Sequence, residues 1–220
     1  MNVITIERKV LEKNDEIAGQ NREFLRKRGL FTLNIVSSPG AGKTSILERT
    51  LEHLDDSINV AVIEGDVQTD FDAQRVARYK VPVAQIITNG GCHLEARLVQ
   101  DALAKIDLTR TELLIIENVG NLVCPANYDL GEDMKVVVVS TTEGDDKPLK
   151  YPLMFQESRV LIINKIDLLP FCDCNADLME ERARAINPAL QIFRVSCRTG
   201  EGLEDWISWL RGEMNKPGRS

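Results

Sequence analysis

The sequence predicts a three-layer α/β fold, in which a mostly parallel central sheet of about seven strands is covered by helices on both faces. Short runs rich in β-branched and apolar residues alternate with longer polar stretches that suit helices, as in repeated βαβ units. Residues 136–139 are four consecutive valines, which is typical of a strand buried on both faces. A chain of 220 residues fits one such domain. The expected strands are Leu33–Val36, Asn59–Ile63, Val83–Thr88, Leu113–Ile116, Val136–Val139, Val160–Ile163 and Gln191–Val195.

A charged segment from Glu7 to Arg28 precedes the first strand and is expected to form an amphipathic helix that Gly29 ends. Its apolar residues recur in pairs every seven positions: Val10 and Leu11, Ile17 and Ala18, Phe24 and Leu25. We expect residues 1–29 to pack on the flank of the domain, and a partner-binding arm is the alternative. A nucleotide-binding domain over residues 30–214 follows, with a tail over 215–220 that should fray. Its last helix, Leu203 to Met214, carries two tryptophans that should pack on the sheet.

A phosphate-binding loop follows the first strand, with the sequence Ser37-Ser38-Pro39-Gly40-Ala41-Gly42-Lys43-Thr44. Small residues between a strand and a helix let backbone N–H groups turn inward toward phosphate oxygens, as in P-loop NTPases. Lys43 is expected to neutralise the β and γ phosphates, and the Thr44 hydroxyl to bind Mg²⁺. Ser37 stands where the motif usually has Gly. The residues expected to hold the phosphates are Gly40, Ala41, Gly42, Lys43, Thr44 and Ser45.

Magnesium needs further oxygen ligands, and carboxylates at the ends of strands can supply them. The candidates are Asp66, Asp72 and Glu117. Gly120 is expected to donate its N–H to the γ-phosphate, which makes residues 117–120 the segment that senses hydrolysis. Asn121 follows, where Ras-like proteins have a water-orienting Gln, so we expect slow intrinsic turnover. Asp72, or a group from a second subunit, is expected to orient the water instead.

A second motif, Asn164-Lys165-Ile166-Asp167, follows a later strand and is typical of guanine recognition. Asp167 can accept hydrogen bonds from both N1–H and the amino group of guanine, whereas adenine would leave buried acceptors unpaired. Asn164 should brace the loop, and the Lys165 stem should cover the base. Ser196-Cys197, after the last strand, is expected to add a backbone N–H to the guanine carbonyl. The two motifs in this order predict a GTP-binding protein.

Three soft ligands follow two other strands: the adjacent pair Cys92 and His93, and Cys124 four residues after Gly120. Thiolate and imidazole favour Zn²⁺ or Ni²⁺ over Mg²⁺, although a buried Cys is often only a small apolar side chain. Three ligands do not close a tetrahedron, and two copies of the chain could complete a shared site. Cys172 and Cys174 are either a second site or exposed thiols.

Composition excludes several classes of function. A net charge of −7 and a pI near 5.0 disfavour a nucleic-acid binder. No apolar stretch is long enough for a membrane span, and the start of the chain lacks the apolar core of a signal peptide, so a cytoplasmic location without membrane association is expected. An odd count of five cysteines suits reduced thiols or metal ligands.

These motifs together closely resemble the HypB family over nearly the whole chain. The segments that carry the resemblance are Ser37–Thr44, Glu64–Val67, Gly91–Leu94, Glu117–Pro125, Thr141–Asp146 and Asn164–Asp167. The resemblance implies a GTPase that helps to insert nickel into [NiFe] hydrogenases. It also implies a dimer when GTP is bound, with a metal at the interface held by Cys92, His93 and Cys124. A HypA-type nickel-binding accessory protein and the hydrogenase large subunit are the implied partners.

The resemblance also implies roles for two further residues. The Asp on the family's strand-to-helix switch matches Asp72, and a lysine that reaches the nucleotide of the opposing subunit best matches Lys150. Some members carry a Cys-rich or His-rich tract near the N-terminus, whereas the first Cys here is Cys92. Tight nickel binding or storage by the N-terminal segment is therefore not expected.

Three other interpretations remain. A related urease-maturation GTPase shares the fold and the chemistry, but its metal motif places Pro between Cys and His, whereas Cys92 and His93 are contiguous. A passive metal-binding scaffold that nucleotide only stabilises is the second. Phosphoryl transfer to a small molecule is the weakest, because the nucleotide domain leaves little room for an acceptor lid.

Overall fold

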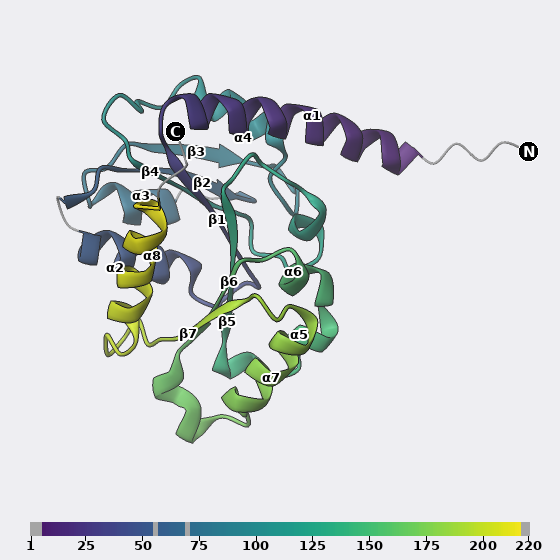
Figure 1. Cartoon of the computed structure of the whole chain (residues 1–220), viewed down its shortest axis with the longest axis vertical. Coiled ribbons are helices and arrows are strands. Elements are labelled where there is room, and N and C mark those ends of the chain that lie inside the picture. The colour runs from purple at the N-terminus through teal and green to yellow at the C-terminus, as the bar shows by residue number, and fades with distance from the viewer. Residues whose placement is uncertain (1–5, 55–56, 69–70, 217–220) are drawn as a thin grey trace, which may run out of the picture.

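A computed structural model of the protein describes residues 6–54, 57–68 and 71–216. It holds a seven-stranded sheet with the strand order β3-β2-β4-β1-β5-β6-β7, in which every neighbouring pair is parallel. The predicted three-layer α/β fold is confirmed (Figure 1). The strands are β1 (Phe31–Ser37), β2 (Val60–Asp66), β3 (Val83–Ile87), β4 (Leu113–Glu117), β5 (Met134–Ser140), β6 (Val160–Asn164) and β7 (Gln191–Arg194).

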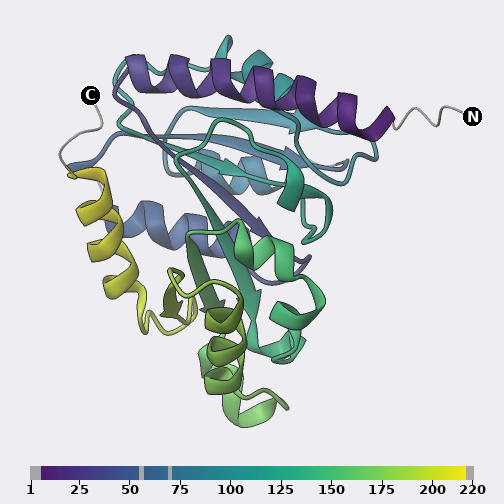
Figure 2. The same cartoon turned by 45° about the vertical axis from the view of Figure 1, so that its right-hand side comes forward.

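Alternation along the buried strands divides the core between the two faces of the sheet. On one face, side chains such as Leu33, Ile115 and Val138 pack with α2 (Lys43–Leu54), α3 (Phe71–Ala77) and α8 (Leu203–Met214). Figure 2 shows α2 and α8 together on this side. Trp206 of α8 is fully buried there, and its Nε1–H donates to Thr50 Oγ1 at 3.0 Å, as a buried indole requires.

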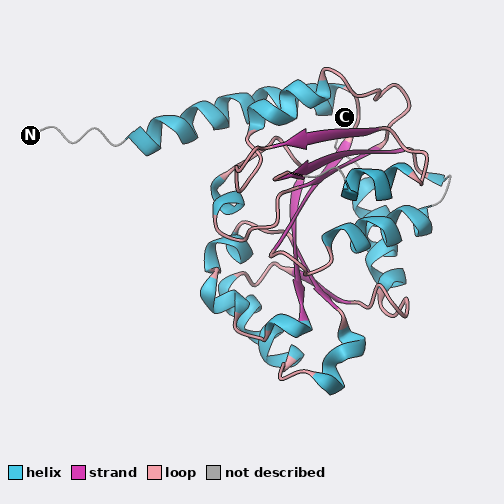
Figure 3. Cartoon of the chain, turned by 180° about the vertical axis from the view of Figure 1, so that it is seen from behind, coloured by secondary structure: helices cyan, strands magenta, loops and turns pink. Residues whose placement is uncertain are grey.

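The other face has two separate helical covers, seen from behind in Figure 3. The first consists of α1 (Ile6–Lys27) and α4 (Ala96–Leu103), which pack over β2 and β4. The second covers β5 and β6. It is built from α6 (Pro152–Gln156), α7 (Ala176–Ile186) and the 3₁₀ turn η2 (Cys124–Asn127), with α5 (Lys147–Lys150) and the 3₁₀ turns η3 (Thr141–Glu143) and η4 (Ile166–Phe171) beside them.

The buried face of α1 differs from the expected apolar stripe. Ala18 and Leu25 are buried as expected, but Ile17 and Phe24 are only half-buried. Asn14 and Asn21 take the remaining buried positions, at 6% and 1% exposure. Polar side chains on this face form hydrogen bonds with the loops beneath, which a hydrophobic pattern cannot reveal. Within the described part of the chain, no helix has both the length and the apolar character to cross a bilayer. Residues 217–220 of the expected frayed tail lie outside the described residues.

Candidate functional site

Because all seven strands are parallel, their carboxyl ends share one edge of the sheet, where ligands bind in open α/β folds. The phosphate-loop segment leaves β1, and the Asn-Lys-x-Asp segment leaves β6. The carboxylate-bearing ends of β2 and β4 lie on the other side of β1. All the predicted motifs therefore meet at this edge.

The phosphate loop has the backbone conformation that its glycines allow. Gly40 and Gly42 have φ of 79° and 102°, in the left-handed region that L side chains rarely adopt. A Cβ at Gly42 would lie 2.4 Å from Asn164 Nδ2, so the loop and the base-recognition motif are in direct contact. Helix α2 begins at Lys43, which places its N-terminal N–H groups where phosphate oxygens are expected.

The base-recognition motif is held to the phosphate loop by two further bonds. Asn164 Nδ2 donates to Ala41 O at 3.0 Å, and Lys165 Nζ donates to Gly40 O at 2.7 Å. Asn164 therefore braces the loop, as predicted. Ser196 Oγ donates to Asp167 Oδ1 at 2.7 Å, which orients the carboxylate predicted to read guanine.

A cavity of about 400 Å³ lies between these motifs. Predicted residues from three separate segments line it: Gly42, Ser45, Asn164, Lys165, Asp167 and Cys197. Burial raises the pKa of the Cys197 thiol to about 11, so this thiol is neutral at physiological pH. The Asp167 carboxylate lies in the lining together with Glu48 and Glu52, and the cavity is large enough to hold a purine ring.

Three carboxylates cluster beside the phosphate loop, but they are not the predicted set. Glu64, Asp72 and Glu117 offer oxygen atoms that lie within 4.8 Å of one another. Asp66 lies outside this group, and its Oδ1 instead accepts from Gln68 N at 2.8 Å. We missed Glu64, which β-sheet pairing places directly beside Glu117. A charged residue among the apolar residues of this strand was the available signal.

Burial and repulsion between like charges favour the protonated forms of Glu64 and Glu117. Burial, followed by the charge of Glu117, raises the pKa of Glu64 to about 8. Burial likewise raises the pKa of Glu117 to about 7, although Lys43 and a bond from Thr44 oppose the shift. Thr44 Oγ1 donates to Glu117 Oε1 at 2.8 Å, and Lys43 Nζ lies 3.8 Å from the same oxygen.

This cluster fits Mg²⁺ by the chemistry of its donors. All the donors are hard oxygen atoms. Glu117 Oε2 is buried without a hydrogen-bond partner among the described residues, which is the arrangement expected of an oxygen that accepts a cation. A cation there would supply charge neutralisation for the phosphates, and Thr44, Asp72, Glu117 and Glu64 are the residues that would hold it.

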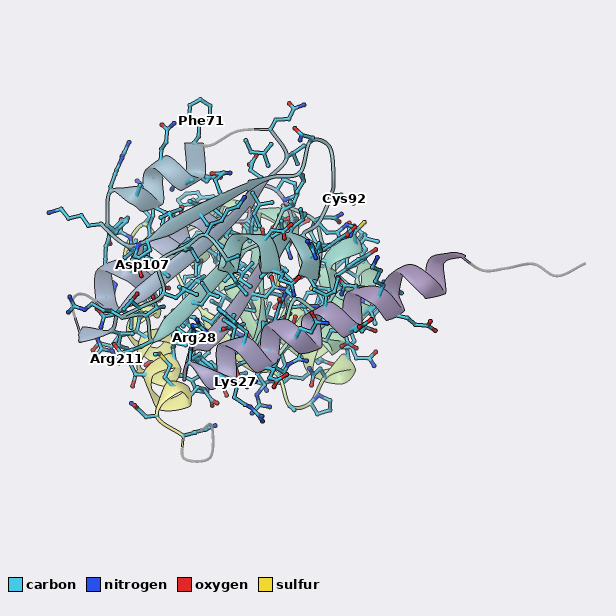
Figure 4. All side chains as sticks on the ribbon, turned by 90° about the horizontal axis from the view of Figure 1, so that it is seen from above. Lys27, Arg28, Phe71, Cys92, Asp107 and Arg211 are labelled. Carbon is cyan, nitrogen blue, oxygen red and sulfur yellow. The ribbon has the colours of Figure 1, made fainter. Side chains whose placement is uncertain are left out.

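The predicted soft ligands also come together. One ligand atom from each of Cys92, His93 and Cys124 lies within 4.8 Å of the others, and the two sulfur atoms are 2.9 Å apart. Cys92 is exposed and lies at the periphery of the molecule in Figure 4. Burial lowers the pKa of His93, which keeps its imidazole neutral and able to ligate. Its Nε2 is buried with no hydrogen-bond partner in the described part of the chain, and the Tyr128 ring packs against it at 3.9 Å.

The loop of residues 88–95 carries Cys92 and His93 and is termed the soft-ligand loop. Residues 117–121 contact this loop directly. Asn118 Oδ1 accepts from Leu94 N at 3.0 Å and from Val119 N at 2.9 Å. Asn121 Nδ2 donates to Cys92 O at 3.2 Å. Two asparagines of this segment thus hold the loop on either side of His93. Sequence reasoning assigned no role to Asn118 and considered Asn121 only as a replacement for a catalytic Gln.

Gly120, between Asn118 and Asn121 in the same segment, packs on the phosphate loop. A Cβ at Gly120 would lie 3.3 Å from Pro39, which is tighter than an ordinary contact. The small residue therefore allows the segment to approach the position where a γ-phosphate is expected. Its predicted N–H contact to that phosphate remains a prediction.

Two predicted groups lie apart from these clusters. Lys150 is largely exposed on α5, where its Nζ forms an ion pair with Asp146 Oδ2 at 2.6 Å. Cys172 and Cys174 form no metal-ligand group of three among the described residues, and Cys174 packs partly against the hydrophobic core.

Comparisons with known proteins give the family. Residues 31–194 match the model of the CobW/HypB/UreG nucleotide-binding domain. Hydrogenase maturation factor HypB of Azotobacter vinelandii is 51% identical over 94% of this chain and 69% of its own length. Hydrogenase/urease maturation factor HypB of Helicobacter pylori is 41% identical over 94% and 86%, respectively.

Solved structures agree with the sequence comparisons. Hydrogenase maturation factor HypB of Archaeoglobus fulgidus superposes with a TM-score of 0.87 at 39% identity, covering 93% of this chain and 100% of that one. HypB of Helicobacter pylori in complex with nickel gives the same TM-score and identity, covering 92% and 95%. The chain therefore belongs to the HypB group of the CobW/HypB/UreG family, as the sequence motifs predicted.

Proposed function

We propose that the protein is a slow, GTP-hydrolysing switch that carries nickel, or zinc, for the maturation of [NiFe] hydrogenase. The nucleotide occupies the cavity beside Asp167 and the loop ending at Lys43 and Thr44. The metal ion is its cargo, held by Cys92, His93 and Cys124. The names of the relatives support the hydrogenase role, and the nickel complex of one solved relative supports the metal.

The observation that carries this proposal is the direct connection between residues 117–121 and the soft-ligand loop. Asn118 and Asn121 bond to Leu94 N and Cys92 O, respectively, while Gly120 packs on Pro39 of the phosphate loop. A γ-phosphate that draws Gly120 toward it displaces Cys124, only four residues further along the chain. Such a displacement changes the separation of the ligands, so GTP and GDP states differ in metal affinity.

In hydrolysis, Lys43 neutralises the charge that develops on the phosphates, and Gly120 donates its N–H to the γ-phosphate. Asp72 is the residue that orients the attacking water. Its carboxylate lies in the Glu64–Glu117 cluster at the phosphate end of the site. Asn121 is already bonded to the Cys92 carbonyl rather than directed at a water, so intrinsic turnover is slow.

A dimer with GTP bound would bring two soft-ligand sites together and complete the coordination that three ligands leave open. Two features support this face as the interface. Cys92 is exposed, and Val123, beside Cys124, is apolar and 58% exposed. Lys150, on the exposed side of α5, is the residue that would reach the partner's nucleotide. A HypA-type accessory protein and the hydrogenase large subunit are the proposed partners.

Service to urease is the second candidate, because the Helicobacter pylori relative is named for both hydrogenase and urease maturation. The contiguous Cys92-His93 pair favours hydrogenase. Restoration of hydrogenase but not urease activity, in cells that lack their own factor, would support the first candidate.

The decisive experiment measures Ni²⁺ affinity in the presence of GDP and of a non-hydrolysable GTP analogue. A switch predicts affinities that differ by about 5- to 150-fold, the usual range of coupling between sites. Cys124→Ala should abolish the difference. Cys172→Ala is the matched control, since that thiol lies outside the ligand cluster. Equal affinities in the two nucleotide states would support a passive scaffold and overturn the proposal.

A further inference from the structure

The buried face of α1 carries two amide side chains that its hydrophobic pattern does not account for. Asn14 and Asn21 are spaced by two helical turns and therefore lie on the same side of the helix. Ala18 lies between them and has no exposed surface. A buried amide is unfavourable unless its polar atoms are hydrogen-bonded.

Both amides connect the same two segments of the domain. Asn14 Oδ1 accepts from Ala96 N at 2.9 Å, while its Nδ2 donates to Asp129 O at 2.8 Å. Asn21 Nδ2 donates to Ala96 O at 2.8 Å and to Leu130 O at 3.0 Å. The N–H and the C=O of Ala96 are thus each joined, through α1, to the turn at residues 129–131.

These two segments lead directly to the soft ligands. Ala96 begins α4, three residues after His93, and Asp129 follows Cys124 by five residues. Tyr128, immediately before Asp129, packs its ring against the His93 ring at 3.9 Å. A change in the distance between Ala96 and the turn at residues 129–131 would therefore change the distance between the Cys92-His93 pair and Cys124.

The turn itself is docked closely on α1. Gly131 has a φ of 95°, and a Cβ there would lie 2.7 Å from Asn21 Cβ and 2.8 Å from Ala18 O. Arg22 Nη2 donates to both carboxylate oxygens of Asp129, at 2.7 and 2.6 Å. This backbone contact and this ion pair add to the hydrogen bonds of the two Asn side chains, so the turn has little freedom to slide along the helix.

We propose that Asn14 and Asn21 are positioning residues of the soft-ligand site, through which α1 fixes the separation between the Cys92-His93 loop and the segment that carries Cys124. This inference rests on the metal function proposed above. Removal of either amide leaves buried backbone groups unpaired and lets the two segments separate. The ligands then coordinate the metal with altered geometry as well as reduced affinity.

Cobalt provides a test because Co²⁺ is a spectroscopic substitute for Zn²⁺ and Ni²⁺ whose visible absorption reports ligand type and geometry. The full chain, bound to GDP, is titrated with Co²⁺ as wild type and as Cys92→Ala, Asn14→Ala and Asn21→Ala. Each asparagine variant should bind Co²⁺ about 10- to 100-fold more weakly, the usual effect of residues that orient metal ligands. Its absorption bands should shift, and its GDP affinity should remain that of wild type.

Gln20→Ala is the matched control. Gln20 also joins α1 to α4, through a 3.1 Å bond from Gln100 Nε2, but it does not bond to the turn. It should retain the Co²⁺ affinity and spectrum of wild type. An equal loss in Gln20→Ala would indicate general loosening of the helix and would overturn the inference.

The remaining outcomes separate this inference from the proposed function. Binding that survives Cys92→Ala unchanged means that the metal function itself is wrong. Loss in Cys92→Ala, with wild-type affinity and spectrum in both asparagine variants, overturns only the positioning role. Asn14→Asp is the substitute if Asn14→Ala does not fold. The aspartate still accepts from Ala96 N but has no donor for Asp129 O, so an unchanged spectrum there also contradicts the inference.

Discussion

Replacing Asp167 with Asn should change the base that the protein prefers. In the wild type, Ser196 Oγ holds the Asp167 carboxylate at 2.7 Å, and guanine offers it N1–H and an amino group. Hydrogen bonds to a charged group contribute about 1.5–3 kcal/mol each. The Asn side chain keeps one oxygen that can accept from N1–H, but its Nδ2 cannot accept from the amino group, so binding weakens by about 1.5–3 kcal/mol, or roughly 10- to 10²-fold. Xanthine presents a carbonyl in place of the amino group, and the new amide can donate to it.

Competition against a fluorescent GDP analogue measures this change, with GDP and xanthosine diphosphate as competitors. Asp167→Asn should bind xanthosine diphosphate more tightly than GDP, the reverse of the wild-type order. Ser196→Ala is the control, because it removes only the hydroxyl that orients the carboxylate. It should weaken GDP binding by about fivefold without favouring xanthine, because the carboxylate loses one orienting bond but keeps both of its acceptor oxygens. An unchanged preference for guanine in Asp167→Asn would refute the assignment of this cavity.

Two further substitutions test the phosphate end of the site. Without metal or nucleotide, the free energy of unfolding should fall as pH rises, by about 1.4 kcal/mol per pH unit for each extra proton that the folded state binds. The window runs from pH 4.5 to about 8 for Glu64 and to about 7 for Glu117, because both pKa values are raised in the folded state. Glu64→Gln should reduce this slope in urea unfolding from pH 5 to 8, leaving the share of Glu117; an unaltered slope would contradict the raised pKa. Gly42→Ala should abolish GDP binding, since its Cβ would lie 2.4 Å from Asn164 Nδ2. In Gly40→Ala the added Cβ would meet no heavy atom within 4 Å, so this variant should reduce binding far less. Equal effects of the two substitutions would disprove the steric argument.

The sheet could be predicted because its buried strands are short runs of apolar and β-branched residues in the sequence. Each predicted strand appears within three residues of its observed ends, and all the inner strands are almost wholly buried. The sequence also indicated that the Ser37–Thr44 and Asn164–Asp167 motifs lie at one edge of the sheet, because parallel strands bring their carboxyl ends to the same edge.

The acidic cluster could not be predicted completely, because it depends on register. Glu64 and Glu117 are neighbours only through the pairing of β2 with β4, two strands that a single sequence does not align. Strand β2 also extends to Asp66, beyond the predicted end at Ile63. Glu64 and Asp66 both follow that predicted end, and only the observed pairing shows that Glu64 is the one beside Glu117.

The buried asparagines could not be predicted because hydrophobic periodicity treats them as solvent-exposed positions. Asn14 and Asn21 of α1 and Asn118 after β4 each lie below 10% exposure and bond to backbone groups of other segments. Their partners are as many as 115 residues distant in the sequence. No local pattern indicates which backbone groups lack partners until the chain has folded.

Four asparagines hold the soft-ligand loop from two directions. Asn118 and Asn121 bond to it from the nucleotide side, and the amides of α1 bond to Ala96 beyond it. Leaving a buried amide or carbonyl unpaired costs about 1–3 kcal/mol. When residues 117–121 move slightly, the hydrogen bonds from Asn118 and Asn121 are therefore expected to stay intact and to pull the loop with them. Because α1 holds the far end of the same loop, such a displacement changes the geometry of the ligands rather than carrying the loop along as a unit. In the proposed switch, nucleotide control of metal affinity therefore requires both the bonds from Asn118 and Asn121, which move, and the bonds from α1, which stay in place.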